Sequence, residues 1–191
     1  VITPPQPHQT RVVEKLKASG GVAAFHRVGS GNTLTSLMAQ DALNLPADVV
    51  TPAPLVANYE KEQAKHLDGP PPPTRVRSYE RAIRDGGIDP SGFVVFDEAH
   101  RGRNSATATS KLLRDAQQAK KRLFLTATPV FNAPSDIAPI LNAAAGENRF
   151  PLDPRAFDEK YVARHEVKPG MLARLFGAEA GSYPVLKNRH D

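Results

Sequence analysis

Residues 93–100 read F-V-V-F-D-E-A-H, four apolar residues followed directly by two acids. A short apolar run of this kind is typical of a strand that is buried on both faces of a parallel sheet. Burying an unpaired carboxylate is costly, so two acids at the end of such a strand indicate a metal site or a cleft. The alternative interpretation is a solvated turn between a strand and a helix.

The two acids fit separate roles in phosphoryl chemistry. Asp97 is expected to hold Mg²⁺, largely through the water shell of the ion. Glu98 is expected to orient the attacking water and to take its proton. We therefore predict a catalytic pair, Asp97 and Glu98, at the end of this strand.

A glycine loop, V-G-S-G-N-T at residues 28–33, lies between a predicted strand and a predicted helix. Glycines let the backbone wrap an anion, so that amide N–H groups point at phosphate oxygens. The pattern G-x-x-x-x-G-K-[ST] is incomplete, because His26 stands at its first glycine and Asn32 at its lysine. Taken alone, such a loop is more often a tight turn than a nucleotide site. The candidate cofactor-binding residues here are Val28, Gly29, Ser30, Gly31, Asn32 and Thr33, and the Thr33 hydroxyl is expected to reach Mg²⁺.

A third motif, L-F-L-T-A-T-P at residues 123–129, is a second apolar run, and it ends in two hydroxyl side chains, Thr126 and Thr128. Apolar patches alternate between strand-like and helix-like spacing along the whole chain. Strands are predicted at 22–25, 48–51, 74–78, 92–97 and 122–126, and helices at 7–18, 33–43, 55–66, 79–84, 105–118, 135–145 and 153–163. This alternation predicts an α/β fold, a parallel sheet with helices on both faces.

The three motifs follow one another in a fixed order, each at the carboxyl end of a predicted strand, where parallel sheets bind ligands. In this order the sequence resembles the first RecA-like lobe of superfamily 2 helicases and, within them, the Swi/Snf-type DNA translocases. The resemblance covers roughly residues 5–163 and implies a P-loop NTPase lobe that binds ATP with Mg²⁺. We assign residues 1–163 to this lobe and expect residues 164–191 to form a tail or the start of an appended segment.

The resemblance implies roles for further segments. P-H-Q-T-R-V-V, from residue 7 to 13, resembles the segment that reads adenine, with Gln9 as the base contact. His100 is expected to couple the nucleotide site to the T-A-T segment through Thr126 and Thr128.

Two more segments, V-V-T-P-A-P-L at 49–55 and V-R-S-Y-E at 76–80, resemble motifs that grip a nucleic-acid backbone. The candidate nucleic-acid contacts are Thr51, Pro52, Ser78, Tyr79, Arg101 and Arg103. For the two arginines, a solvated basic loop fits nearly as well.

Asn32 is the departure from the family pattern with the largest expected consequence. In the family, a lysine at this position contacts the β- and γ-phosphates, whereas asparagine donates a hydrogen bond but carries no charge. A charge-assisted hydrogen bond contributes roughly 1.5–3 kcal/mol, which is at least about tenfold in rate or affinity. Asn32 is therefore either an engineered inactivating change or a naturally degenerate position.

The formal net charge of +5 and the sequence pI of about 9.6 fit a phosphate-rich partner. The expected partners are DNA, with duplex favoured, and a second RecA-like lobe that supplies an arginine finger. The sequence predicts no second set of strands after residue 150, so this chain alone is expected to be a poor ATPase. No cysteine and no apolar run of membrane-spanning length are present, which favours an intracellular place, cytoplasmic, nuclear or carried by a virus.

Two other functions stay open. One is a D-E-A-H-type RNA helicase lobe, which strand displacement on RNA would separate from a translocase stimulated by duplex DNA. The other is a non-catalytic nucleotide-binding scaffold, favoured by Asn32 and opposed by the intact pair Asp97 and Glu98.

Overall fold

The structure is a computed structural model that describes residues 3–26, 29–67, 69, 72–103, 107–127, 133–167 and 181–186. Two predicted site residues, Val28 and Thr128, lie outside this part of the chain. The main sheet consists of β1 (Gly21–Phe25), β2 (Ala47–Thr51), β3 (Thr74–Ser78), β4 (Phe93–Phe96) and β5 (Lys121–Thr126). Their order in the sheet is β1-β5-β4-β2-β3, and every pairing is parallel.

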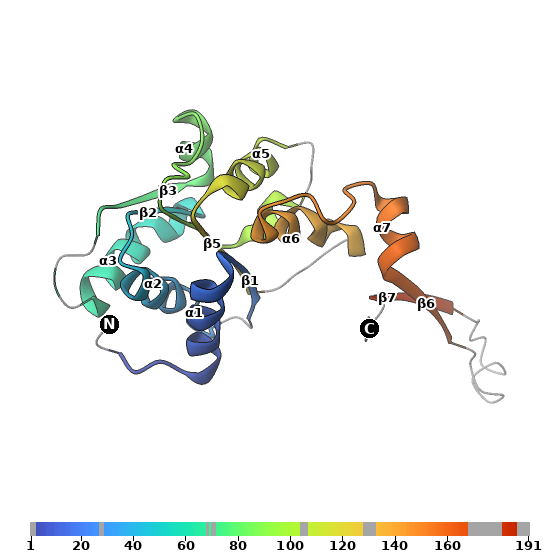
Figure 1. The fold of residues 1–191 in the computed structure, drawn as a ribbon, viewed down its shortest axis with the longest axis horizontal. Helices are drawn as coiled ribbons and strands as arrows, with labels where there is room; N and C mark the ends of the chain where they lie inside the picture. Colours follow the sequence, from blue (N-terminus) through green and yellow to red (C-terminus); the bar gives the residue numbers. More distant parts are fainter. Residues whose placement is uncertain are drawn as a thin grey trace.

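Two layers of helices enclose the sheet, as Figure 1 shows. One face carries α1 (Pro7–Ser19), α2 (Asn32–Leu43) and α3 (Val56–His66); the other carries α4 (Tyr79–Arg84), α5 (Ala108–Asp115) and α6 (Ala138–Ala145). Short 3₁₀ helices precede α3 (Ala53–Leu55) and α6 (Pro134–Ile137), follow β4 (Ala99–Gly102) and follow α5 (Ala116–Gln118). The predicted parallel sheet with helices on both faces is therefore confirmed.

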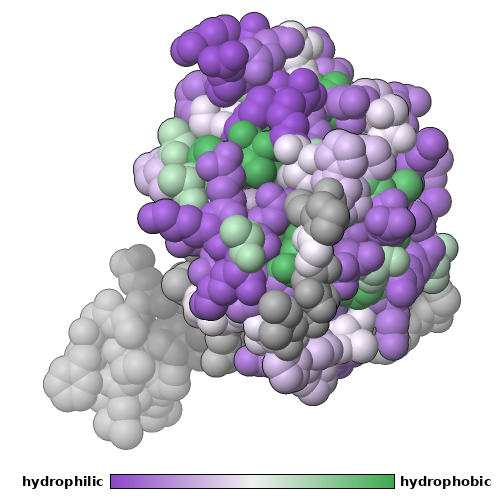
Figure 2. Space-filling model, turned by 90° about the vertical axis from the view of Figure 1, so that its left-hand side faces the viewer, coloured by the Kyte–Doolittle hydropathy of each residue, from purple (hydrophilic) through white to green (hydrophobic). Residues whose placement is uncertain are grey.

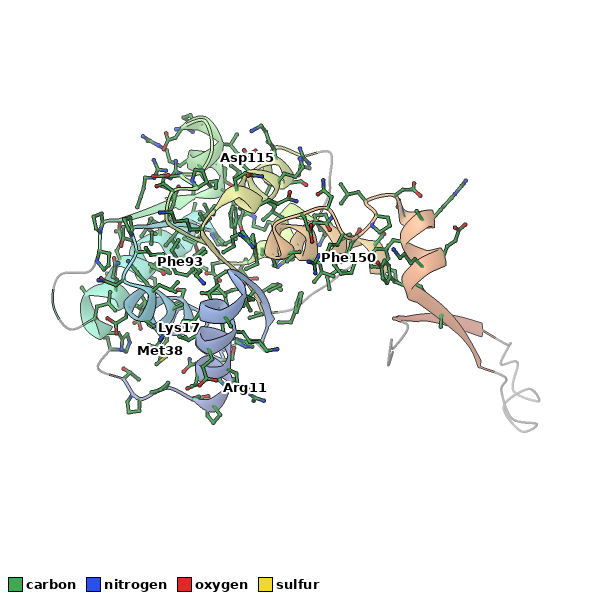
Figure 3. All side chains as sticks on the ribbon, in the orientation of Figure 1. Arg11, Lys17, Met38, Phe93, Asp115 and Phe150 are labelled. Carbon is green, nitrogen blue, oxygen red and sulfur yellow. The ribbon has the colours of Figure 1, made fainter. Side chains whose placement is uncertain are left out.

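Alternation along the strands sends side chains into two separate cores. In β4, Phe93 and Val95 pack against α1 to α3, whereas Val94 and Phe96 pack against α4 to α6. All four are fully buried, and Figure 3 labels Phe93 inside the larger body of the molecule, which holds the main sheet. Because both faces are covered, the strand has to be apolar at every position, which is why F-V-V-F identified it.

The predicted elements need small corrections at their ends. The helix expected at 105–118 is shorter, as α5 plus a 3₁₀ turn, and residues 104–106 lie outside the described part. The helix expected at 153–163 is α7 (Pro154–Tyr161), and β6 (Val162–Val167) begins directly after it. Apolar Val162 continued the helical pattern, but its backbone pairs with Leu186.

The strand β6 pairs with β7 (Gly181–Leu186) in an antiparallel hairpin that lies beyond α7, away from the main sheet (Figure 1). The predicted boundary at residue 163 therefore falls inside a strand. Whether residues 164–191 form a unit of their own stays a prediction. In the described residues, no helix has the length and apolar character needed to cross a membrane.

Candidate nucleotide site

All five parallel strands end at one edge of the sheet, and the predicted site residues gather there. Phe25 pairs with Thr126, and Val50 pairs with Phe96, so the segments that follow β1, β2, β4 and β5 come together. The order of the strands places β4 between β2 and β5. The carboxylates that follow β4 are therefore flanked by the ends of both neighbouring strands.

The glycine loop leads directly into α2. Gly29 and Gly31 both have φ of 79°, a left-handed conformation that residues with a Cβ rarely adopt. Gly31 is the N-cap of α2, and its carbonyl accepts hydrogen bonds from the Thr35 amide at 2.9 Å and the Thr35 hydroxyl at 3.0 Å. The first backbone N–H groups of α2 thus face the end of the sheet, the arrangement that binds phosphate at a helix N-terminus.

Two side chains of α1 hold this loop by its carbonyl groups. His8 Nε2 lies 3.1 Å from the Ser30 carbonyl oxygen, and because a carbonyl only accepts, Nε2 donates. Gln9 Nε2 donates to the Gly31 carbonyl at 3.4 Å, while Gln9 Oε1 accepts from the Gln6 amide at 2.9 Å. The Gln9 side chain is only 1% exposed and is used at both ends, so it braces the loop. Its contact with a base stays a prediction.

Asp97 is a buried carboxylate at the centre of the edge. It is 6% exposed, and its oxygens accept from the Thr51 hydroxyl and the Glu98 amide, each at 3.1 Å. Burial raises the pKa of Asp97 to about 6, a shift that Thr51 opposes by its hydrogen bond and that the nearby Glu98 charge reinforces. A carboxylate held this way is suited to a cation that supplies the missing compensation.

Thr51 and Tyr79, both predicted as nucleic-acid contacts, have another role in this structure. Their side chains are 0% and 1% exposed, and the Tyr79 hydroxyl donates to the Asp97 carbonyl at 2.7 Å. Because both hydroxyls are buried and used by Asp97, these side chains position the carboxylate and do not face a nucleic acid. This corrects the prediction for the two side chains.

The other predicted nucleic-acid contacts lie outside the cleft. Pro52 and Ser78 are half-buried, and Ser78 caps α4 by accepting from the Arg81 amide at 3.1 Å. Arg101 is exposed, donates to Glu80 at 3.2 Å and stacks 5.2 Å above the Tyr79 ring. Arg103 is half-buried and takes part in an interaction of its own.

Glu98, His100 and Thr126 form a chain of contacts between the D-E-A-H and T-A-T segments. Glu98 has φ of 53°, an unusual value for a residue with a side chain. His100 Nδ1 lies 3.1 Å from a Glu98 carboxylate oxygen and 2.9 Å from the Thr126 hydroxyl. This geometry fits the predicted coupling of the two segments.

A cleft of about 430 Å³ joins the loop to the carboxylates. Its lining residues are Gly29, Gly31, Asn32, Thr33, Leu34, Leu55, Asn58, Glu62, His66, Asp97, Glu98 and Ala127. The lining thus includes three carboxylates and neither lysine nor arginine among the described residues. Sequence reasoning missed the wall formed by α3, where His66 lies between Glu62 at 2.8 Å and Thr3 at 2.5 Å.

Three polar atoms around the loop are buried without a hydrogen-bond partner in the described part of the chain: His26 Nδ1, Ser30 Oγ and Asn32 Oδ1. Leaving such groups unsatisfied costs roughly 1–3 kcal/mol each, so their concentration at one loop indicates that a polar ligand belongs there. Burial lowers the pKa of His26, repulsion from His8 lowers it further, and the Asn32 side chain partly opposes both. The loop is thus short of partners in the same place where a phosphate is expected.

Comparisons with known proteins find similarity to helicase-related proteins. A family model described as the SNF2-related domain matches residues 74–166, which include the D-E-A-H and T-A-T segments. The "Putative ATP-dependent RNA helicase" of Acanthamoeba polyphaga mimivirus is 28% identical over 177 residues, covering 81% of this chain and 35% of that protein. A "Termination factor NPH-I homolog" of African swine fever virus is 25% identical over 202 residues, covering 90% of this chain and 29% of that protein.

Two solved structures share the fold. The Sulfolobus solfataricus SWI2/SNF2 ATPase core in complex with dsDNA has a TM-score of 0.63 and 19% identity, over 84% of this chain and 39% of that one. The Pyrococcus furiosus Hef helicase domain has a TM-score of 0.62 and 22% identity, over 76% of this chain and 36% of that one. This chain therefore spans about a third of the length of the proteins it matches.

Proposed function

We propose that this chain binds Mg²⁺-ATP in the cleft between its glycine loop and Asp97. It belongs to the superfamily 2 helicases and translocases as a first RecA-like lobe, most like the Swi/Snf type. The observation that carries the proposal is the meeting of Thr33, Asp97 and Glu98 in one cleft at the carboxyl edge of a parallel sheet. The unpartnered polar atoms beside the loop support the fit of a phosphate group.

Each residue of the cleft has a proposed task. Backbone amides from Gly29 to Thr33 bind the phosphates, and Thr33 and Asp97 hold Mg²⁺, largely through water. When bound, Mg²⁺ neutralises phosphate charge. Glu98 orients the attacking water and accepts its proton. His100 contacts both Glu98 and Thr126, and through these contacts it couples Glu98 to the T-A-T segment.

We further propose that the whole protein is a nucleic-acid-dependent ATP hydrolase and that this lobe supplies half of its site. The cleft has no arginine or lysine among its described lining residues, so the charge that develops during phosphoryl transfer needs an outside cation. A second RecA-like lobe would provide an arginine finger. The 191-residue chain by itself is then a poor ATPase.

DNA is the proposed track, with duplex favoured. The SWI2/SNF2 core of similar fold is described in complex with dsDNA. In this chain, exposed arginines gather on β3 and α4, namely Arg75, Arg81 and Arg84. The surface over α4, at the top of Figure 2, is strongly hydrophilic, as a backbone-binding surface would be. We place the protein where nucleic acid is found, inside a cell or carried by a virus.

Calorimetry with the native chain at millimolar ATP and Mg²⁺ tests the nucleotide proposal. Weak but measurable binding is expected, and it should vanish with EDTA. No heat, together with no change in melting temperature, would remove any nucleotide role.

Anisotropy with labelled duplex DNA at two salt concentrations tests the second proposal. Because one lobe offers only half of the proposed DNA-binding surface, we expect weak binding that falls steeply with salt. Binding that ignores salt, or no binding at low salt, would rule out the DNA assignment.

Two alternative functions are each favoured by one observation. A D-E-A-H-type RNA helicase is favoured by the name of the mimivirus relative, a putative ATP-dependent RNA helicase. RNA binding in the same anisotropy assay, stronger than duplex DNA binding, would support it. A non-catalytic scaffold is favoured by Asn32, and retained partner binding without any nucleotide binding would support it.

A further inference from the structure

The cleft has an unsolved charge problem. A bound nucleotide would bring phosphate charge next to Glu62, Asp97 and Glu98, all of which line the same cleft. Mg²⁺ offsets part of that charge, but Asn32 stands where a lysine would offset more. His66 is the basic residue among the described lining residues, and it is already engaged by Glu62 and Thr3.

His26 directly follows β1 and precedes the glycine loop, and one of its ring nitrogens is available for a further hydrogen bond. Its backbone amide donates to the Thr126 carbonyl at 3.1 Å, which fixes the residue at the end of β1. Its Nδ1 is buried without a hydrogen-bond partner among the described residues, and so is Asn32 Oδ1. The Asn32 side chain is nevertheless close enough to act on the pKa of the His26 ring. The two residues that carry these unpartnered atoms are therefore neighbours.

We propose that His26 takes up a proton when a nucleotide enters the cleft, and that its Nδ1–H then donates to Asn32 Oδ1. The proton comes from solvent, and the imidazolium supplies behind Asn32 the positive charge that a lysine would have carried. Asn32, with its oxygen held by His26, presents its amide N–H₂ to the phosphates as a neutral relay. This inference rests on the proposed nucleotide site and gives the source of the positive charge that Asn32 does not supply.

The surroundings of His26 favour the neutral form until a ligand arrives. Among the described residues, the titratable side chain recorded against His26 is His8 on α1, with its ring edge-to-face at 4.8 Å and 83°. From the other elements, Asn32 on α2 and the Thr126 carbonyl on β5 contribute dipoles and no charge. Burial and His8 together hold the pKa of His26 below its usual 6.5, so the free protein is neutral there at pH 7.5. Phosphate charge nearby raises the pKa, so binding takes up a proton.

Calorimetry of Mg²⁺-ATP binding in buffers of different ionisation heat measures the proton directly. At pH 7 we expect the native chain to take up a large fraction of a proton, and its affinity to tighten several-fold from pH 8 to pH 6.5. His26→Gln should bind with little proton uptake and a nearly flat pH dependence. Asn32→Lys should also lose the uptake, because the lysine charge opposes protonation of His26.

His66→Gln is the matched control, since it removes the histidine that lines the cleft. The uptake should persist in this variant. If His66→Gln abolishes the uptake and His26→Gln keeps it, the proton lands on His66 and the proposal is overturned.

Two further outcomes are separated by design. Binding by the native chain without proton uptake would contradict the His26 proposal and would still support the nucleotide site. No binding by either the native chain or Asn32→Lys, at any pH, means that the proposed function itself has failed. Should His26→Gln fail to fold, NMR titration of the His26 ring decides, with a pKa that rises on adding Mg²⁺-ATP expected and an unchanged pKa contradicting the proposal.

Discussion

The two sides of the proposed nucleotide cleft are built on the same sheet edge but differ in how their polar groups are satisfied. On the D-E-A-H side, the Asp97 oxygens accept from Thr51 and Glu98, and His100 contacts both Glu98 and Thr126. On the glycine-loop side, buried polar atoms of His26, Ser30 and Asn32 have no partner in the described part of the chain.

The difference separates polar groups whose hydrogen-bond partners come from the protein itself from polar groups whose partners would come from a ligand. The acidic side keeps its geometry through contacts within the protein, so it should tolerate the absence of nucleotide. The loop keeps its backbone shape through Gly29, Gly31 and the α1 side chains, but its buried polar atoms have no partner among the described residues, and in the proposed function a phosphate supplies one. A change on the acidic side should therefore affect chemistry, whereas a change on the loop side should affect binding.

The largest expected effect comes from Glu98→Gln, measured with the second lobe present and Asn32→Lys in the background. Turnover should fall by roughly a hundredfold or more, because the proposed base is lost while the proposed metal ligand Asp97 remains. Nucleotide affinity should stay within about threefold. Equal losses in turnover and affinity would mean that Glu98 serves binding, and the contrast between the two sides would break.

A smaller effect is expected from glycine substitutions in the loop. Gly31→Ala places a Cβ 3.0 Å from Gln9 Nε2 at a positive φ, so stability should fall by about 2 kcal/mol. Gly29→Ala is the matched control, because its Cβ would meet nothing within 4 Å and only the cost of its φ, about 1 kcal/mol, applies. Urea unfolding measures both. Equal losses would show that the Gln9 contact adds nothing to the loop.

Asp97→Asn should stabilise the metal-free chain by about 1–2 kcal/mol at pH 7.5, because it removes a buried charge. The sign follows from the raised pKa of Asp97, about 6: ionising it costs stability above that pH, and protonating it removes the cost below. The gain should therefore fade as the pH falls from 6 to 4. Urea unfolding in EDTA at several pH values measures it, and a gain that persists at pH 4 would contradict the burial argument.

Much of the candidate site was predictable from the sequence because its signals are local. Four apolar residues before Asp97 and Glu98 identified β4, and glycines before Asn32 identified the turn into α2. Parallel topology then required these segments to meet. Local patterns were therefore sufficient wherever the candidate site residues directly follow a strand in the sequence.

The corrections concern contacts between residues far apart in the chain. Thr51 reaches Asp97 across 46 residues, and His66 reaches Thr3 across 63, so no window of sequence reveals either contact. Glu62 and His66 gave only the pattern of a charged helix face. The pairing of Val162 with Leu186 likewise depends on a distant strand, which is why the sequence predicted helix there.

The change Asn32→Lys has the smallest expected effect, about tenfold in affinity, and tests the central claim most directly. Paired calorimetric titrations of Mg²⁺-ATP into the native chain and Asn32→Lys should show weak binding that becomes about tenfold tighter, with unchanged melting of the free proteins. The reason is that the loop already has the proposed phosphate-binding shape and lacks only a permanent positive charge. Equal affinities, or no binding to either chain, would contradict a phosphate site at this loop and would leave a non-catalytic scaffold as the better account.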